Sequence, residues 1–229
     1  MQEEFLKRGI YLTEEKLGKF AKFKDLLLEF NEKFNLTAIK TEKEIYIKHF
    51  VDSIIAVDKF KKLSTVIEIG SGGGFPSIPL KIVRDDLEFT LIEATGKKCE
   101  FLKTVVKELG LEKVTVINAR AEELGKEEKY REKFDYATAR AVARLNVLSE
   151  YCMPFLKVGG KFIAYKGNAE EELIEAENAV SVLGGRIDSA EKYYLSDGGD
   201  ERTIIEIEKV RKTPEKYPRG NGKERKNPL

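Results

Sequence analysis

The sequence lacks the residues from which metal centres and disulfide frameworks are usually built. Its 229 residues include one histidine and two cysteines, Cys99 and Cys152. One histidine excludes a site with several histidine ligands, and two cysteines are too few for a disulfide framework. No apolar run reaches the roughly 18 residues that span a bilayer. We therefore expect no metal site, no membrane segment and two unreactive thiols.

The first residues also lack the apolar stretch of an export signal. The sequence begins MQEEFLKRG, which is charged rather than hydrophobic. Without export the thiols stay reduced, so we expect a cytoplasmic protein. A length of 229 residues fits one domain whose core is large enough to need no disulfides. No feature demands a second copy of the chain, and we expect a monomer.

Charge is nearly balanced overall but unevenly placed. The net charge is +1, yet residues 209–229 hold eight Lys or Arg and two Glu, a local charge of +6. The rest of the chain therefore carries about −5. A basic segment on a mildly acidic body favours a polyanionic partner, and a solvated chain end is the alternative. We treat residues 211–229 as a basic C-terminal arm.

The first sixty residues have helical patterning. Thr13 is a candidate N-cap for a helix that runs to about Phe34. Thr41 and Glu44 form a capping box at the start of a second, strongly apolar helix. These helices have too little core to fold separately. We expect residues 1–62 to be a helical cap that belongs to the same unit as the domain that follows.

From residue 63 the chain alternates between strand and helix patterns, as in an α/β fold with a mostly parallel, Rossmann-like sheet. Two alternating segments around a turn at residues 196–200 predict an antiparallel hairpin at one edge of that sheet. We expect the sheet domain to span residues 63–210. The predicted strands are residues 65–69, 88–93, 114–117, 134–138, 161–165, 186–195 and 203–210, with a helix at 145–156.

A glycine-rich loop, Gly70, Ser71, Gly72 and Gly74 followed by Phe75, comes directly after the first predicted strand. Glycine lets the backbone turn sharply and approach a ligand with no Cβ in the way. In a dinucleotide-binding fingerprint, a third glycine permits close packing of the following helix, but that position is Phe75 here. The loop fits S-adenosylmethionine better, because that cofactor has no pyrophosphate. All five residues are candidate cofactor contacts.

Polar residues after the next two strands extend this candidate site. Glu93 ends the second predicted strand, where a carboxylate can accept hydrogen bonds from both ribose hydroxyls. Oxidoreductases use the same position, so Glu93 alone does not identify the cofactor. Ala121 and Glu122, after the third strand, could meet the edge of an adenine base. A surface charge is the alternative for Glu122.

Several motifs, in chain order, make the sequence resemble the RsmG (GidB) family of bacterial 16S ribosomal RNA guanine-N7 methyltransferases. The resemblance spans nearly the whole chain. It departs at Glu93, where many relatives have Asp, although either carboxylate can bind a ribose. The matching motifs are Asn35-Leu36-Thr37, residues 49–54, 70–79, 91–93 and 96–98, Arg120-Ala121-Glu122, residues 138–143, Lys166-Gly167 and residues 216–219.

The resemblance also implies a cofactor, a substrate and a mechanism. S-adenosylmethionine is the methyl donor, and 16S ribosomal RNA, free or within the small subunit, is the partner. Guanine N7 carries a lone pair at neutral pH, so the transfer needs positioning rather than a general base. The residues assigned to the donor are Gly70, Phe75, Ala121, Glu122 and Arg140, with Glu93 at the ribose.

Basic residues supply the candidates for holding RNA. Arg140 and Lys166 follow the fourth and fifth predicted strands, so they are candidates for positioning the reactants. Tyr217 lies between basic residues, a pairing that suits contact with an unstacked base and its phosphates. On this basis Arg219→Ala weakens RNA binding and leaves donor affinity alone. The candidate RNA contacts are Arg120, Lys166, Arg202, Lys216, Tyr217 and Arg219.

His49 admits two interpretations. It lies three residues before Asp52, so one helical face could hold both side chains for catalysis. A hydrogen-bonded histidine that fixes the cap helices to the sheet is favoured over the catalytic interpretation.

Two other functions fit parts of the sequence. A nicotinamide-dependent reductase would share the glycine loop and Glu93, but Phe75 argues against it. A non-catalytic RNA-binding assembly factor would keep the fold, but an intact donor loop argues against it. We expect an S-adenosylmethionine-dependent methyltransferase.

Overall fold

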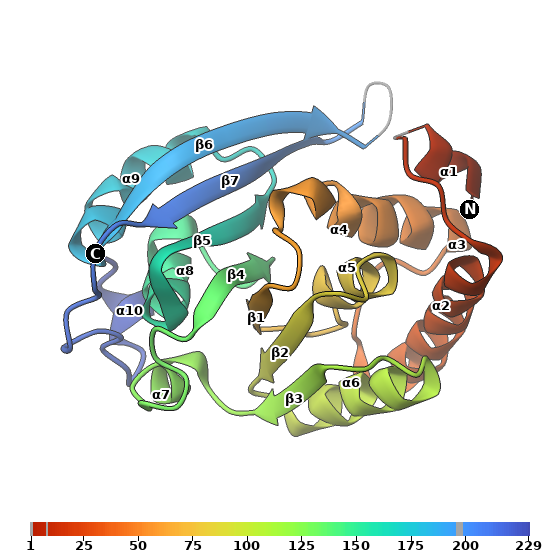
Figure 1. Cartoon of the computed structure of the whole chain (residues 1–229), viewed down its shortest axis with the longest axis horizontal. Coiled ribbons are helices and arrows are strands. Elements are labelled where there is room, and N and C mark those ends of the chain that lie inside the picture. The colour runs from red at the N-terminus through yellow and green to blue at the C-terminus, as the bar shows by residue number, and fades with distance from the viewer. Residues whose placement is uncertain (1, 8, 196–198) are drawn as a thin grey trace.

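A seven-stranded sheet runs through the centre of the molecule, with helices on both of its faces (Figure 1). The computed structural model describes residues 2–7, 9–195 and 199–229, so the predicted turn at 196–200 lies partly outside the described residues. The strand order is β3-β2-β1-β4-β5-β7-β6. Strands β1 to β5 pair in parallel, and β7 pairs antiparallel with both β5 and β6. The prediction of a mostly parallel sheet with an antiparallel edge hairpin is confirmed.

The strands are β1 (Thr65–Ile69), β2 (Glu88–Glu93), β3 (Val114–Asn118), β4 (Phe134–Arg140), β5 (Leu156–Lys166), β6 (Gly185–Tyr194) and β7 (Glu201–Lys209). The α-helices are α1 (Gln2–Leu6), α2 (Glu14–Phe34), α3 (Glu42–Glu44), α4 (Asp52–Ile54), α5 (Ser77–Val83), α6 (Gly96–Glu108), α7 (Ala121–Leu124), α8 (Leu145–Cys152), α9 (Glu170–Val182) and α10 (Lys223–Lys226). Three other helical segments are η1 (Ile45–Val51, a π-helix), η2 (Val57–Lys59) and η3 (Met153–Phe155), the last two being 3-10 turns. Among the described residues, no helix could cross a membrane.

The boundary between α8 and β5 differs from the prediction. The α-helix ends at Cys152 rather than near residue 156, and the strand begins at Leu156 rather than at residue 161. Pro154 lies in the intervening 3-10 turn. Because proline has no backbone N–H to donate, it cannot continue an α-helix through that position.

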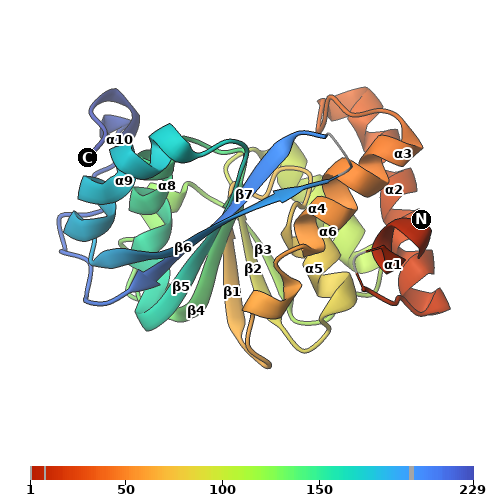
Figure 2. The same cartoon turned by 90° about the horizontal axis from the view of Figure 1, so that it is seen from above.

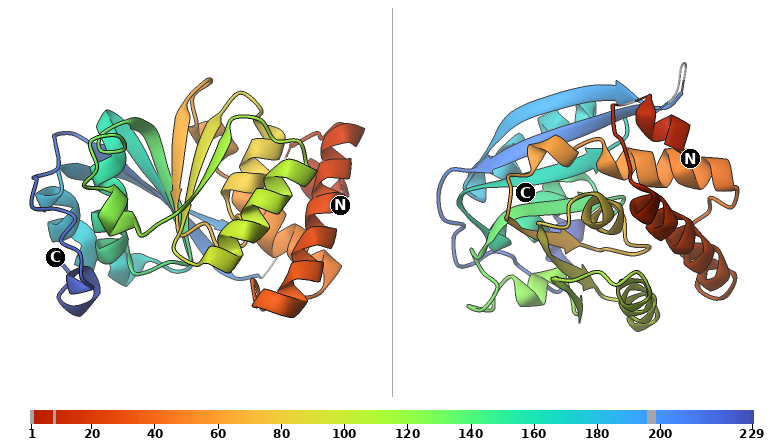
Figure 3. Two further views of the ribbon diagram at one scale, coloured as in Figure 1. Left: turned by 90° about the horizontal axis from the view of Figure 1, so that it is seen from below. Right: turned by 45° about the vertical axis from the view of Figure 1, so that its right-hand side comes forward.

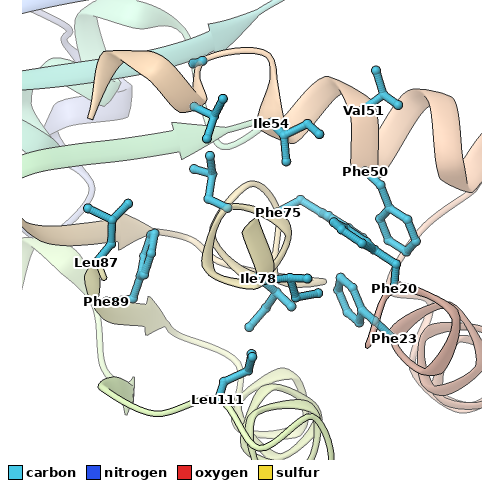
Figure 4. Close-up of a cluster of buried hydrophobic side chains, with 14 of the residues drawn as sticks. Phe20, Phe23, Phe50, Val51, Ile54, Phe75, Ile78, Leu87, Phe89 and Leu111 are labelled. Carbon is cyan, nitrogen blue, oxygen red and sulfur yellow. The ribbon is translucent and has the colours of Figure 1, made fainter. Parts of the chain in front are cut away.

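Two hydrophobic clusters lie on the two faces of the sheet, and Figure 2 shows the helices on either side of the strands. The first joins the N-terminal helices to α5 and α6, and Figure 4 shows its aromatic side chains meeting around Phe75. The Phe23 ring centroid lies 5.3 Å from that of Phe75 and 5.3 Å from that of Phe50. Thr13 caps α2 as expected, accepting a hydrogen bond from the Lys16 N–H. The predicted cap helices therefore pack directly against the glycine loop.

The second predicted cap helix contains a seven-residue π-helical segment, η1. Its start is as expected, since the Thr41 hydroxyl accepts the Glu44 N–H at 3.4 Å and donates to the Glu44 carboxylate at 2.7 Å. A π turn holds one more residue than an α turn, and such turns often lie at functional sites. This segment presents His49 to Arg140 at the end of β4, and Asp52, the first residue of α4, pairs with the same arginine.

The C-terminal segment, residues 211–229, folds back against α7 and α8 instead of extending as a basic arm (Figure 3). Arg131 donates hydrogen bonds to the Thr213 carbonyl at 2.8 Å and to the Tyr217 carbonyl at 2.8 Å. Tyr217 is 6% exposed and belongs to the second hydrophobic cluster. Partly buried Leu229 packs against the same cluster. This segment is part of the folded domain, because both its backbone and its aromatic side chain have partners in the body.

Candidate active site

A cavity of about 920 Å³ opens at the carboxyl ends of β1 to β4. Strand β1 lies between β2 and β4, so the chain crosses the sheet in opposite directions on its two sides. In open α/β sheets this reversal leaves a crevice outside the strand ends, where ligands bind. The glycine loop, Glu93 and Arg140 line one continuous surface of the cavity.

Gly70 and Gly72 of the loop differ in what an added side chain would meet. Gly70 has φ +69, and a Cβ there would lie 2.8 Å from a methyl of Val142. Gly72 has φ +52, and a Cβ there would meet only the Gly70 carbonyl oxygen, at 3.7 Å. The space beside Gly72 is therefore available to a ligand that approaches the backbone.

Gly74 serves packing rather than ligand contact. It has φ +86, and a Cβ there would lie 2.7 Å from the Ile78 side chain. Gly74 is absent from the cavity wall, whereas Gly70, Ser71, Gly72 and Phe75 belong to it. The close helix packing that a dinucleotide fingerprint assigns to its third glycine is therefore performed by Gly74, one residue before Phe75. A contact between Gly74 and the cofactor stays a prediction.

Glu93 ties the glycine loop to the end of β2. One carboxylate oxygen accepts the Gly72 N–H at 3.0 Å, and the other accepts the Thr95 N–H at 2.8 Å. The side chain is buried at the cavity wall. Each carboxylate oxygen can accept a second hydrogen bond. The remaining lone pairs can therefore receive the two hydroxyls of a ribose.

Arg140, at the end of β4, is held by groups from the cap. Its guanidinium donates to the Asp52 carboxylate at 2.7 Å, to the Lys48 carbonyl at 3.1 Å and to His49 Nδ1 at 2.8 Å. The guanidinium carbon lies 5.0 Å from the centre of the Phe75 ring. Asp52 also accepts the Tyr193 hydroxyl at 2.7 Å. Arg140 therefore has one fixed position at this end of the cavity.

His49 is a neutral structural residue in this arrangement. Burial, together with the Arg140 charge, lowers the pKa of His49 to about 3. Because an arginine can only donate, Nδ1 accepts and Nε2 carries the proton, which is donated to Thr37 Oγ1 at 2.7 Å. The ring stacks on Phe75 with centroids 4.3 Å apart. Both nitrogens are occupied, which favours the structural interpretation over the catalytic one.

The cavity extends past β3 to a wall formed by α7 and the C-terminal segment. Ala121 and Glu122 line it where an adenine edge was expected, and exposed Arg120 lies beside them. Gly220 and Arg225 line the facing side. This contribution from the C-terminal segment was not foreseen, because no local pattern indicates that a basic segment folds back onto α7.

Three of the residues expected to contact RNA are engaged inside the protein. Lys166 Nζ pairs with Glu172 at 2.6 Å and donates to the Ala143 carbonyl at 2.8 Å. Arg219 forms a two-pronged pair with Glu150, which is 1% exposed. Tyr217 is buried, so its ring has no free face for a base. These contacts give the three residues structural roles, and a direct RNA contact by any of them stays a prediction.

The other basic candidates are nearer to solvent. Lys216 is exposed, with its ammonium 5.2 Å from the centre of the Tyr217 ring. Arg202 lies 4.0 Å from Asp52 and 3.6 Å from Asp200. Lys98, which the sequence did not single out, lines the cavity next to the glycine loop. Within the described part of the chain, neither Lys98 nor Arg120 forms an ion pair.

Solved structures that share this fold include several named as methyltransferases. An O-methyltransferase from Bacillus cereus in complex with SAH superposes with a TM-score of 0.59 at 15% identity, over 82% of this chain and 91% of that chain. M. jannaschii TYW2 in complex with AdoMet gives 0.58 at 14% identity, over 76% of this chain and 80% of that chain. These likenesses establish the fold. With the glycine loop and Glu93 in the crevice, they place the chain in the Rossmann-like class of folds.

Sequence relatives then identify the family. A family model described as rRNA small subunit methyltransferase G (GidB) matches residues 16–197. "Ribosomal RNA small subunit methyltransferase G" of Lactobacillus johnsonii is 47% identical, covering 99% of this chain and 97% of that protein. The protein of the same name from Acetivibrio thermocellus is also 47% identical, covering 96% and 92%. The chain belongs to this family, which confirms the resemblance seen in its motifs.

Proposed function

We propose that this chain transfers a methyl group from S-adenosylmethionine to N7 of a guanine in 16S ribosomal RNA. The proposal rests on the single cavity in which the glycine loop, Glu93 and Arg140 meet. The names of relatives with 47% identity support small-subunit ribosomal RNA as the class of substrate. The N7 atom is our choice of acceptor, because the site is built for positioning rather than for proton transfer.

The residues of the cavity fit the donor. The open space beside Gly72 admits a ligand close to the backbone, and the Glu93 carboxylate has lone pairs left for a ribose. Arg140 offers a fixed positive charge at the far end, where a carboxylate of the amino-acid part could pair with it. When bound, S-adenosylmethionine supplies a methyl group that its sulfonium centre has already activated.

The site has little capacity for general-base catalysis, and the proposed acceptor requires none. Guanine N7 keeps a lone pair at neutral pH, so no proton has to leave before methylation. His49 cannot accept a proton, since Arg140 and Thr37 occupy its two nitrogens. The contribution of the protein is then to hold the two reactants in line and to exclude other geometries.

Support for the RNA surface comes from the edge of the cavity. Lys98 and Arg120 line the cavity, and neither forms an ion pair with a described residue. Free cations beside a crevice suit the phosphates that flank a target base. A base must leave its stack to enter such a crevice, so we expect the target guanine in a loop or flipped out. We further propose that the chain acts in the cytoplasm as a monomer.

The proposal is tested by mapping the methyl group. Purified protein with labelled S-adenosylmethionine and small-subunit ribosomal RNA should place the label on guanine N7. Gly72→Asp should abolish transfer, because it puts a carboxylate into the open space of the donor site. Gly110→Asp is the matched control, since Gly110 also has a positive φ and open surroundings but lies at the end of α6. Label on another atom, or full activity of Gly72→Asp, would contradict the proposal.

A further inference from the structure

The C-terminal segment is fixed to the body by a buried charge pair. The Arg219 guanidinium donates to both carboxylate oxygens of Glu150, at 2.7 to 3.1 Å, and the Arg219 N–H donates to the same carboxylate at 2.8 Å. Lys126, just past the end of α7, donates to the Arg219 carbonyl at 3.2 Å. A carboxylate that is almost fully buried needs such partners to offset its lost hydration. The position of Arg219 is therefore closely defined.

Directly after this anchor the chain turns into the cavity. Gly220, Asn221 and Gly222 have φ of +82, +59 and +72, three left-handed residues in a row, and all three line the cavity. A Cβ on Gly220 would lie 3.3 Å from Lys126 Nζ and 4.0 Å from Glu122. The Gly220 N–H also donates to the buried carboxylate of Glu224. The turn thus brings backbone into contact with the side of α7 that faces the cavity.

The short helix α10 places one cationic side chain at the same wall. Arg225 lines the cavity together with Tyr151 of α8, and its charge opposes the rise that burial causes in the pKa of Tyr151. Lys226, the next residue of α10, is exposed and takes no part in the cavity wall. Of these two neighbouring cations, only Arg225 therefore faces the cavity.

We propose that the C-terminal segment forms the outer wall of the donor site and that Arg225 contacts the adenine ring of the methyl donor. This inference rests on the proposed function, which puts S-adenosylmethionine in the cavity. With the ribose at Glu93 and the amino-acid part at Arg140, the base extends past β3 towards Ala121 and Glu122. Arg225 and Gly220 line the same cavity, and a Cβ on Gly220 would lie 4.0 Å from Glu122. A planar guanidinium stacks well on an aromatic ring, which a lysine does less well.

The experiment compares two ligands and two variants by calorimetry. The probes are S-adenosylhomocysteine and 5′-methylthioadenosine, which lacks the amino-acid part. Arg225→Ala should weaken both by the same factor, about fivefold for an exposed cation on an aromatic ring. Lys226→Ala removes the same charge one residue further along and should change neither affinity. RNA binding, followed as a function of salt, should respond alike to the two variants.

Each outcome decides between the alternatives. Loss of affinity for S-adenosylhomocysteine alone would move Arg225 to the amino-acid part and overturn the contact with adenine. Unchanged binding of both probes to Arg225→Ala, or equal losses in the two variants, would show that the segment is not a wall of the donor site. Failure of the unaltered protein to bind either probe would contradict the proposed function instead, so the two failures are distinguishable.

Discussion

The two ends of the cavity are held in different ways. At the β4 end, Arg140 is shared by Asp52, His49 and the Lys48 carbonyl, all from the N-terminal cap. At the α7 end, the wall is the C-terminal segment, held by the pair between Arg219 and buried Glu150, by hydrogen bonds from Arg131 and by the burial of Tyr217. Figure 1 shows these supports on opposite sides of β1, with α4 on one side and α10 on the other.

This difference implies different functions for the two ends. Several partners from one rigid cap fix the direction of the Arg140 guanidinium, which is what positioning for a reaction demands. The C-terminal segment is held through one charge pair, backbone carbonyls and a buried tyrosine, so it encloses a ligand but fixes no side chain at the reacting atoms. We therefore expect changes at the β4 end to act on the rate of methyl transfer and changes at the α7 end to act on donor affinity.

The largest effect is expected for Arg140→Lys. A lysine has no planar fork, so it cannot reach the carboxylate of Asp52 and Nδ1 of His49 together. Leaving a buried carboxylate without its partner costs several kcal/mol, and we expect methyl transfer to fall about 100-fold. Binding of 5′-methylthioadenosine should stay within about twofold of the unaltered protein, since that probe does not reach Arg140. Equal losses in the two measurements would remove the proposed division between the ends.

A smaller effect at the same end is expected for Asp52→Asn. The amide keeps the shape of the side chain but removes its charge, so the hydrogen bond to Arg140 weakens. We expect kcat to fall about tenfold with a smaller change in the KM for the donor. Tyr193→Phe is the matched control, because it removes the other hydrogen bond to Asp52 and leaves the charge. If Tyr193→Phe lowers kcat as much as Asp52→Asn does, the charge of Asp52 has no special role in positioning.

Arg219→Ala should lower donor affinity rather than the rate of methyl transfer. It releases the wall at the α7 end, so we expect donor affinity to fall about fivefold and the melting temperature to drop by several degrees. The slope of RNA binding against salt should stay the same, whereas exposed Arg120→Ala should reduce that slope by about one. From the sequence alone, Arg219→Ala was expected to act on RNA and not on the donor. A reduced salt slope with unchanged donor affinity would restore that expectation.

The double variant Arg219→Gln with Glu150→Gln tests whether a neutral pair can hold the C-terminal segment in place. It leaves no unpaired charge inside the protein and can keep a neutral hydrogen bond between the two side chains. We expect it to recover most of the melting temperature and donor affinity that Arg219→Ala loses. Recovery of neither quantity would mean that the pair does not fix the segment.

The parts of the site that follow from local pattern could be predicted. A buried β-branched strand followed by glycines and an apolar helix face specifies one crossover unit, and strand ends of a parallel sheet meet at one edge. The glycine loop, Glu93 and Arg140 were therefore placed together from the sequence. The antiparallel hairpin at the edge followed from its alternating pattern in the same way.

Partners that depend on tertiary contacts could not be predicted. Asp52 and Arg140 are 88 residues apart in the chain, and Glu150 and Arg219 are 69 apart. The sequence shows that a residue is a lysine or an arginine, but not whether its charge faces a phosphate or a buried carboxylate. The basic residues around Tyr217 therefore indicated RNA, although the segment packs against α7 and α8. Similarly, nothing in the residues of η1 distinguishes a π turn from an α turn.

The smallest effect is expected for Glu68→Gln, and it changes the pH dependence of stability rather than activity. Glu68 of β1 is fully buried, and neither of its carboxylate oxygens has a hydrogen-bond partner among the described residues. Burial raises the pKa of Glu68 from 4.5 to about 8. The folded protein therefore binds more protons than the unfolded chain between these values, and this group makes the protein less stable as pH rises from 4.5 to 8.

Glu68→Gln removes that dependence, so the melting temperature of the variant should rise relative to that of the unaltered protein across this range. At pH 4 both proteins carry a neutral side chain at this position, and their difference there is the internal reference. A gap that stays constant from pH 4 to 9 would mean that Glu68 titrates in the folded state as it does in the unfolded chain. The charge of Arg140 would then offset the effect of burial, and the β4 end would contain a second paired carboxylate beside Asp52.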